Sequence, residues 1–134
     1  MLFSFVKYIL LIFVGLLLIL LCSQLQQVTS SEPGEYYYSD FLRNNFTFLA
    51  AAIFFVTGIL TGYYLTLNPW LAGICLIMIF PLISLYEATV YRGSHNLLPF
   101  EFFVYFLFSL PAVIGVYTGD FIFKKVRRKA LTGE

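Results

Sequence analysis

The side chains with the most potential for chemistry gather in one polar segment late in the chain. Carboxylates at Glu87 and Glu101 flank Arg92 and His95. At a membrane surface an arginine can hold a phosphate through two hydrogen bonds while a histidine moves a proton, as action on a lipid headgroup or an isoprenoid phosphate requires. Their spacing matches no catalytic motif, and charges that pair within an outer loop account for them as well. We treat these four residues as weak catalytic candidates and favour the ion-pairing interpretation.

A second pair of charged residues, Asp120 and Lys124, stands near the end of the last apolar run. Pumps and proton-coupled transporters use a charge within the bilayer, where it is costly. Here the middle of every apolar run lacks charge. Residues four apart share a helix face, so the two side chains can meet while the lysine reaches water. The spacing predicts an ion pair at the membrane interface, with ion coupling through Asp120 as the alternative.

The composition argues against several other kinds of site. The only histidine is His95, which excludes a two-histidine haem site or a histidine-rich metal site within one chain. Cys22 and Cys75 fall at different expected depths, so we expect free thiols rather than a disulfide. No metal or cofactor is expected. The basic tail is too short to form the folded surface that nucleic-acid binding needs.

The chain as a whole is too apolar for a water-soluble fold. Of its 134 residues, 60% are hydrophobic and 11% are charged, against about 25% charged in soluble domains. Four apolar runs approach the ~20 residues that cross a ~30 Å hydrocarbon core. They cover residues 2–22, 47–67, 70–89 and 100–123. We predict an all-α integral membrane protein, one domain over residues 1–134 that forms a four-helix transmembrane bundle.

The connections between the runs refine this prediction. Residues 2–22 share features with a signal peptide, but no small-residue cleavage site follows, so we interpret them as a retained anchor helix. Residues 23–46 form the expected outer loop, whose tyrosines predict a short helix on the bilayer surface. A docking patch for a partner is the alternative there. Pro81 and Pro111 lie inside the third and fourth runs and are expected to bend them.

The basic residues predict the orientation of the bundle. With four spans, Lys7 and the C-terminal basic residues fall on one side, and Arg43 and Arg92 on the other. The positive-inside rule then places both termini in the cytoplasm, with residues 124–134 as a basic tail, and we expect a bacterial inner membrane. The tail is interpreted as a stop-transfer signal that contacts anionic lipid headgroups. Its basic residues are Lys124, Lys125, Arg127, Arg128 and Lys129.

Two similar motifs, at residues 56–62 and 113–119, are the strongest packing signal. Each sets two glycines four residues apart with a threonine just before the second. On a helix these small residues share a face, which lets another backbone approach closely. The predicted packing residues are Gly58, Thr61, Gly62, Gly115, Thr118 and Gly119. The similarity reflects either an internal duplication with a pseudo-two-fold axis along the membrane normal or the frequency of these residues in spanning helices.

Three functions remain open. We favour a small non-catalytic subunit or accessory protein that packs through its glycine faces against other membrane subunits or copies of itself. The first alternative is an oligomeric channel or transporter lined by Thr61, Tyr117, Thr118 and Asp120. The second is a lipid- or headgroup-handling enzyme that uses residues 87–101.

The favoured function predicts that a bulky side chain in the glycine faces disrupts assembly more than the loss of the His95 side chain does. Leucine at Gly62 or Gly119 is expected to disrupt assembly, because its side chain would hold the neighbouring backbone away. His95→Ala should leave assembly intact. Gentle-detergent purification followed by mass spectrometry measures both, and loss of function only at His95 would reverse the ranking.

Overall fold

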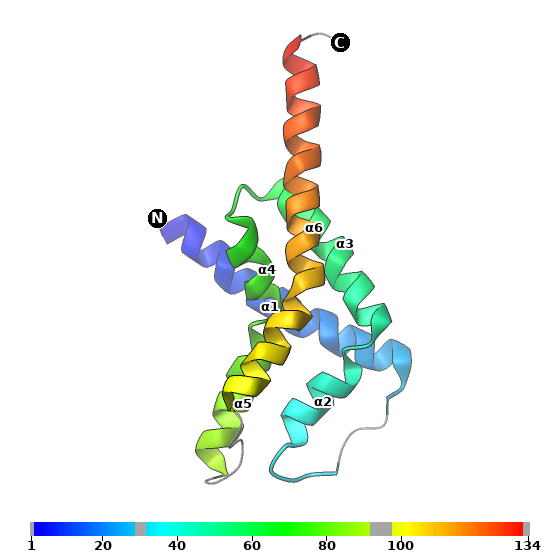
Figure 1. Cartoon of the computed structure of the whole chain (residues 1–134), viewed down its shortest axis with the longest axis vertical. Helices are drawn as coiled ribbons and strands as arrows, with labels where there is room; N and C mark the ends of the chain where they lie inside the picture. Colours follow the sequence, from blue (N-terminus) through cyan, green and yellow to red (C-terminus); the bar gives the residue numbers. More distant parts are fainter. Residues whose placement is uncertain (1, 29–31, 92–97, 133–134) are drawn as a thin grey trace.

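The computed structural model describes residues 2–28, 32–91 and 98–132 (Figure 1). Within these ranges the chain forms six helices and no strand, which confirms the all-helical prediction. The helices are α1 (Leu2–Gln26), α2 (Tyr37–Asn45), α3 (Phe48–Tyr64), α4 (Pro69–Ile77), α5 (Ile79–Val90) and α6 (Leu98–Thr132).

The lengths and hydropathy of the helices identify a membrane-embedded protein. Two helices are long and apolar enough to cross a bilayer alone, over Phe3–Gln26 and Leu98–Arg128. The other four form two bent pairs, with angles of 79° between α2 and α3 and 47° between α4 and α5. The number of spans among the described residues is therefore two, or up to four if each bent pair counts as one.

The break between α4 and α5 follows from Pro81. A proline inside a helix removes one backbone donor, and its ring clashes with the carbonyl four residues earlier, here that of Ile77. The helix breaks at Met78, whose N–H donates to the Cys75 carbonyl at 3.3 Å in a tighter turn. By contrast, α6 continues as one helix through Pro111.

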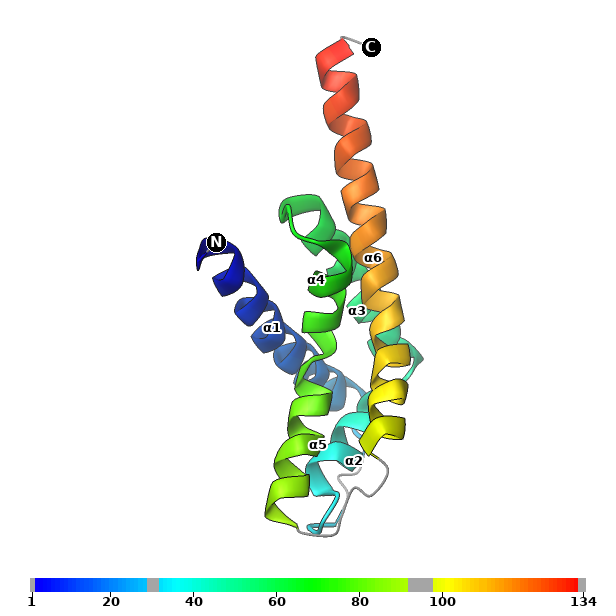
Figure 2. The same cartoon turned by 60° about the vertical axis from the view of Figure 1, so that its left-hand side comes forward.

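The most extensive packing joins α3 to α6, which run in the same direction (Figures 1 and 2). A Cβ built on Gly58 would lie 3.1 Å from the Cα of Gly115, and a Cβ on Gly115 would lie 3.1 Å from the Cα of Gly58. Such a Cβ would come closer still to the Ala112 and Phe55 carbonyl oxygens, respectively. The two glycine motifs of the chain therefore lie against each other.

The next turn repeats this contact. A Cβ on Gly62 would lie 2.9 Å from the Asp120 nitrogen, and one on Gly119 would lie 2.8 Å from the Tyr63 nitrogen. If each residue of the α3 motif is exchanged with the residue at the same place in the α6 motif, the contacts around the four glycines stay the same. The crossing is therefore two-fold symmetric in its contacts, although both helices belong to one chain.

Glycines also mark the other close crossings. A Cβ on Gly15 of α1 would lie 2.8 Å from the Leu76 carbonyl carbon of α4. One on Gly73 of α4 would lie 2.6 Å from the Cα of Val113 in α6. Helix α1 thus packs on α4, and α4 packs on α6, while much of the outer surface of α1 stays exposed.

An aromatic cluster fills the bundle where α2 meets α3. The ring of Phe46, between these helices, stacks on Phe108 of α6 with centroids 4.2 Å apart. It also meets Phe80 of α5 edge-on at 5.7 Å and Phe54 of α3 at 5.7 Å. These contacts tie the start of α3 to α5 and α6.

The crossing predicts how alanine at its glycines will affect stability. Gly62→Ala and Gly119→Ala should each lower the free energy of unfolding by about 1–3 kcal/mol, because each added methyl forces α3 and α6 apart. The double variant should cost less than the sum, since the first methyl already opens the contact that the second would meet. Thermal or denaturant unfolding in detergent measures the three variants.

Gly34→Ala serves as the control. Its Cβ would meet only the Glu32 carbonyl oxygen, at 3.9 Å, in the turn before α2. Additive losses at Gly62 and Gly119, or a loss at Gly34 of the same size, would contradict a shared backbone contact.

Candidate functional site

Glu87, the first of the catalytic candidates, is fully buried, with 0% of its surface exposed. One carboxylate oxygen accepts a hydrogen bond from the Tyr38 N–H at 2.7 Å, and the other accepts from the Ser39 N–H at 3.2 Å. Both donors belong to the first turn of α2, where backbone N–H groups have no partner within the helix. The side chain of Tyr36, at the N-cap position, makes no capping hydrogen bond to these N–H groups. Glu87 therefore caps α2 from a different helix.

The sequence of α2 explains why it needs an external cap. One face of the helix is buried, through Ser39, Leu42 and Asn45. On its polar side Asp40 pairs with Arg43. With nine residues it is shorter than helices that are stable alone in water. Burial of this face and the negative charge of Glu87 at its positive end together stabilise it.

The remaining catalytic candidates are only partly described. Glu101 lies in the first turn of α6, a position where an acidic side chain suits the helix dipole. Arg92 and His95 lie outside the described residues. Of the four candidates, the structure thus gives a contact geometry for Glu87, and that geometry serves the fold.

Two polar links that sequence reasoning missed also join the helices. A buried hydrogen bond of 2.7 Å connects the hydroxyls of Ser84 on α5 and Tyr105 on α6. At the other side, Gln26 at the end of α1 donates to the Asn45 carbonyl at 3.3 Å and accepts from the Thr47 hydroxyl. The sequence does contain a signal for these links, which is a polar residue inside or at the end of an otherwise apolar run.

Asn45 has one satisfied and one unsatisfied side-chain polar atom in the buried interior of the described part of the chain. Its amide nitrogen donates to the Phe41 carbonyl at 2.8 Å. Its amide oxygen is buried without a hydrogen-bond partner. Such an atom is commonly satisfied by an ordered water.

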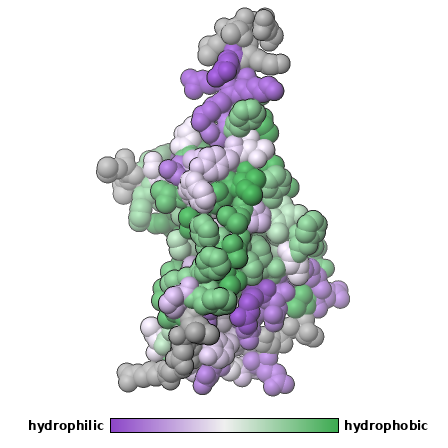
Figure 3. All heavy atoms as spheres, in the orientation of Figure 1, coloured by the Kyte–Doolittle hydropathy of each residue, from purple (hydrophilic) through white to green (hydrophobic). Residues whose placement is uncertain are grey.

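The predicted interface charges lie at the C-terminal end of α6. Lys124 approaches Asp120 at 2.6 Å, and both side chains reach the surface. Lys125, Arg127 and Arg128 follow on the exposed part of α6 that extends past the other helices (Figures 1 and 3). The side chain of Lys129 lies outside the description. Figure 3 shows this end as hydrophilic and the middle of the visible face as hydrophobic.

The threonines of the glycine motifs sit inside the bundle or bond to their own helix. Thr61 is buried beside the α3–α6 crossing, with 6% of its surface exposed. The Thr118 hydroxyl donates to the Ile114 carbonyl at 2.8 Å, one turn back on α6. Neither arrangement needs a partner outside the chain.

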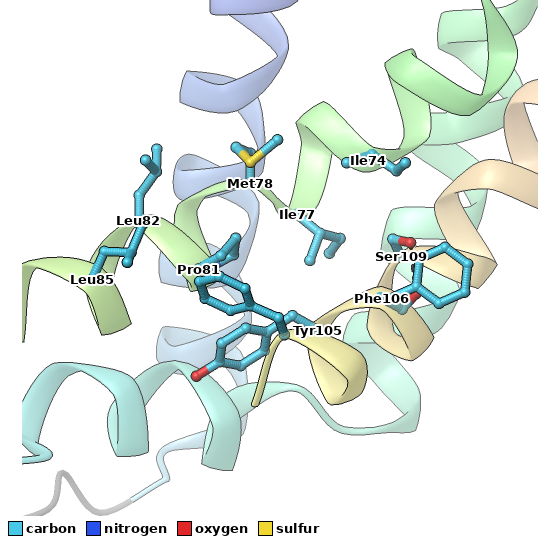
Figure 4. A pocket seen from close by; sticks show the side chains of 10 residues that line it. Ile74, Ile77, Met78, Pro81, Leu82, Leu85, Tyr105, Phe106 and Ser109 are labelled. Carbon is cyan, nitrogen blue, oxygen red and sulfur yellow. Dashed lines mark hydrogen bonds between the residues drawn. The ribbon is translucent and has the colours of Figure 1, made fainter. Parts of the chain in front are cut away.

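Two hollows open on the apolar surface. The first, of about 310 Å³, lies between the α4–α5 break and α6 (Figure 4). Its lining consists of Ile74, Ile77, Met78, Pro81, Leu82, Leu85, Phe102, Tyr105, Phe106 and Ser109. The second, of about 430 Å³, lies between α3 and α6 and is lined by Phe48, Ala51, Ala52, Phe55, Leu110, Pro111 and Ile114.

Among residues 2–28, 32–91 and 98–132, no group of three His, Cys, Asp or Glu side chains is placed to hold a metal ion. Both hollows are lined without a charged residue. Buried Glu87 instead links α5 to α2, buried Ser84 links α5 to α6, and partly buried Gln26 links α1 to the α2–α3 junction.

The cap predicts a specific effect of changing Glu87. Glu87→Gln should lower the free energy of unfolding by about 1–3 kcal/mol, because the amide offers one acceptor and turns a donor toward a backbone N–H. Hydrogen exchange should rise over Tyr37–Asn45 more than over α3. Exchange followed by mass spectrometry in detergent measures this locally.

Glu35→Gln is the matched control, since this glutamate is exposed in the turn before α2. It should leave exchange in α2 unchanged. Equal exchange in α2 for the wild type and Glu87→Gln would show that the carboxylate does not hold the helix.

Known proteins give no further guide to the site. No family model matches the chain, and no curated protein or solved structure matches it either.

Proposed function

We propose that the chain is a small non-catalytic integral membrane protein that serves as a subunit or accessory protein of a larger membrane assembly. The observation that carries this proposal is the use of the buried polar groups. Glu87 caps α2, Ser84 bonds to Tyr105, and Gln26 bonds to the α2–α3 junction. Side chains that could bind or turn over a polar substrate are thereby used to hold helices together.

The packing within the chain changes how partners would bind. The glycine faces of α3 and α6 are covered by each other. A partner that used them would first have to separate these two helices. In this proposal partners therefore contact the remaining lipid-facing surface, which is rich in exposed large apolar side chains.

We also propose a four-span topology in a bacterial inner membrane with both termini in the cytoplasm. The N-terminal end of α1, the α3–α4 turn and the C-terminal end of α6 lie toward one end of the molecule, whereas α2 and the end of α5 lie toward the other (Figures 1 and 2). Helix α3 has 17 residues, or about 25 Å, which nearly crosses a ~30 Å core. In this topology α2 lies along the outer surface, and the basic end of α6 meets anionic headgroups in the cytoplasm.

The two alternative functions have less support. A pore lined by Thr61, Tyr117, Thr118 and Asp120 would need all four side chains to face water. Thr61 is buried in α3, and the Thr118 hydroxyl bonds to its own helix, α6. An enzyme that uses residues 87–101 would need the Glu87 carboxylate, which caps α2.

The test is native co-purification. A tag on the C-terminal end of α6 should recover the chain with at least one other membrane protein in fixed stoichiometry, in gentle detergent. A four-span protein of similar abundance, with the same tag, controls for chance co-extraction. His95→Ala should retain the partner. Recovery of the chain alone, or as a homo-oligomer that conducts ions, would contradict the proposal.

A further inference from the structure

The hollow between the α4–α5 break and α6 is a built feature of the fold. The break at Met78 turns α5 away from the line of α4 by 47°. Helix α6 continues without a matching break, so a wedge opens between them. Figure 4 shows Pro81 and Leu82 on the α5 side of this wedge and Phe106 and Ser109 on the α6 side.

The lining of the hollow has no free polar group for a polar ligand. Its two hydroxyl groups are on Tyr105 and Ser109. The Tyr105 hydroxyl is hydrogen-bonded to Ser84 at 2.7 Å. The Ser109 hydroxyl donates to the Phe106 carbonyl at 2.6 Å. What remains exposed to an occupant is apolar surface.

The size of the hollow distinguishes a single hydrocarbon chain from a protein helix. A helix with its side chains is ~10–12 Å across, so even two turns would occupy roughly 800 Å³ or more. The hollow measures about 310 Å³. At roughly 30 Å³ per water-sized group, that volume holds about ten methylene groups.

In the proposed four-span topology, on which this step rests, the length of the hollow matches one leaflet of a bilayer. On α6 the lining runs from Phe102 to Ser109, and on α4 and α5 it runs from Leu85 back to Ile74. These stretches rise about 10 and 16 Å along a helix, against roughly 15 Å for half of the hydrocarbon core. Exposed Tyr86 stands beside the Leu85 end, where a tyrosine suits the headgroup level.

We infer that this hollow is a binding site for one acyl chain of a membrane phospholipid, which enters from the leaflet on the side of the α5–α6 connection. Pro81 lies in the wall of the hollow at the helix break, and the lining side chains leave its space of about 310 Å³ unfilled. In a bilayer the advantage of such a site comes from van der Waals contact with a preformed groove, since lipid tails are themselves apolar. The occupant is held by shape, with its headgroup left at the surface.

The experiment uses the full chain in phosphatidylcholine vesicles whose lipid carries a photoreactive diazirine on one acyl chain. After irradiation, mass spectrometry maps the lipid adducts. Adducts should concentrate on residues 74–85 and 102–109, several-fold above those on the outer face of α1. Leu17 of α1 is a suitable reference, because it is 64% exposed. Equal labelling on both surfaces would overturn the inference.

Matched tryptophan variants test the shape of the site. Leu82→Trp adds bulk to the wall of the hollow and should reduce the adducts there several-fold. Leu71→Trp makes the same exchange outside the lining, at a residue that is similarly exposed (52% for Leu71, 46% for Leu82). This control should leave the number of adducts in the hollow unchanged. Leu85→Trp, at the mouth, repeats the test if Leu82→Trp alters the elution of the protein. If Leu82→Trp or Leu85→Trp folds normally and the labelling of the hollow is unchanged, the inference is also overturned.

Discussion

The close approach of α3 and α6 is the contact on which the rest of the structure depends. In a bilayer apolar side chains gain little by leaving lipid, so two spans associate through van der Waals contact and weak polar contacts between backbones. Gly58 and Gly115 meet with no side chain between them. One turn later, Gly62 meets the backbone of α6 at Asp120, and Gly119 meets the backbone of α3 at Tyr63. Because each helix supplies the same motif in the same direction, the glycine faces of α3 and α6 cover each other in one symmetric crossing.

Two parallel helices within one chain need a return segment between them, and α4 with α5 provides it. Gly73 lets α4 pack tightly on Val113 of α6, just before the α6 motif. Pro81 then breaks the return segment, and α5 leaves the line of α4 by 47°. Along this direction α5 contacts α6 through Ser84 and Tyr105, and its Glu87 reaches the first turn of α2.

Composition predicted the helical class, and Pro81 predicted the bent third run, because both depend on local sequence. Pro111 was expected to bend the fourth run in the same way, but α6 continues through it as one helix. Local sequence did not predict the role of Glu87, because its donors at Tyr38 and Ser39 lie far away in the sequence. The spacing of the glycines predicted small-residue faces but could not say what covers them. A glycine face specifies close approach without specifying a partner, whereas a charged or shaped side chain narrows the choice.

The symmetry of the crossing bears on the origin of the two motifs. An inherited duplication of a helical hairpin would make the segments before α3 and α6 equivalent as well. They differ, since α2 forms a bent pair with α3 at 79°, whereas α5 forms its bent pair with α4 at 47°. The contact symmetry has a simpler cause. Any two parallel helices with the same small-residue spacing bury it most fully by facing each other in register, so packing alone produces the two-fold relation whether or not the sequences share an ancestor.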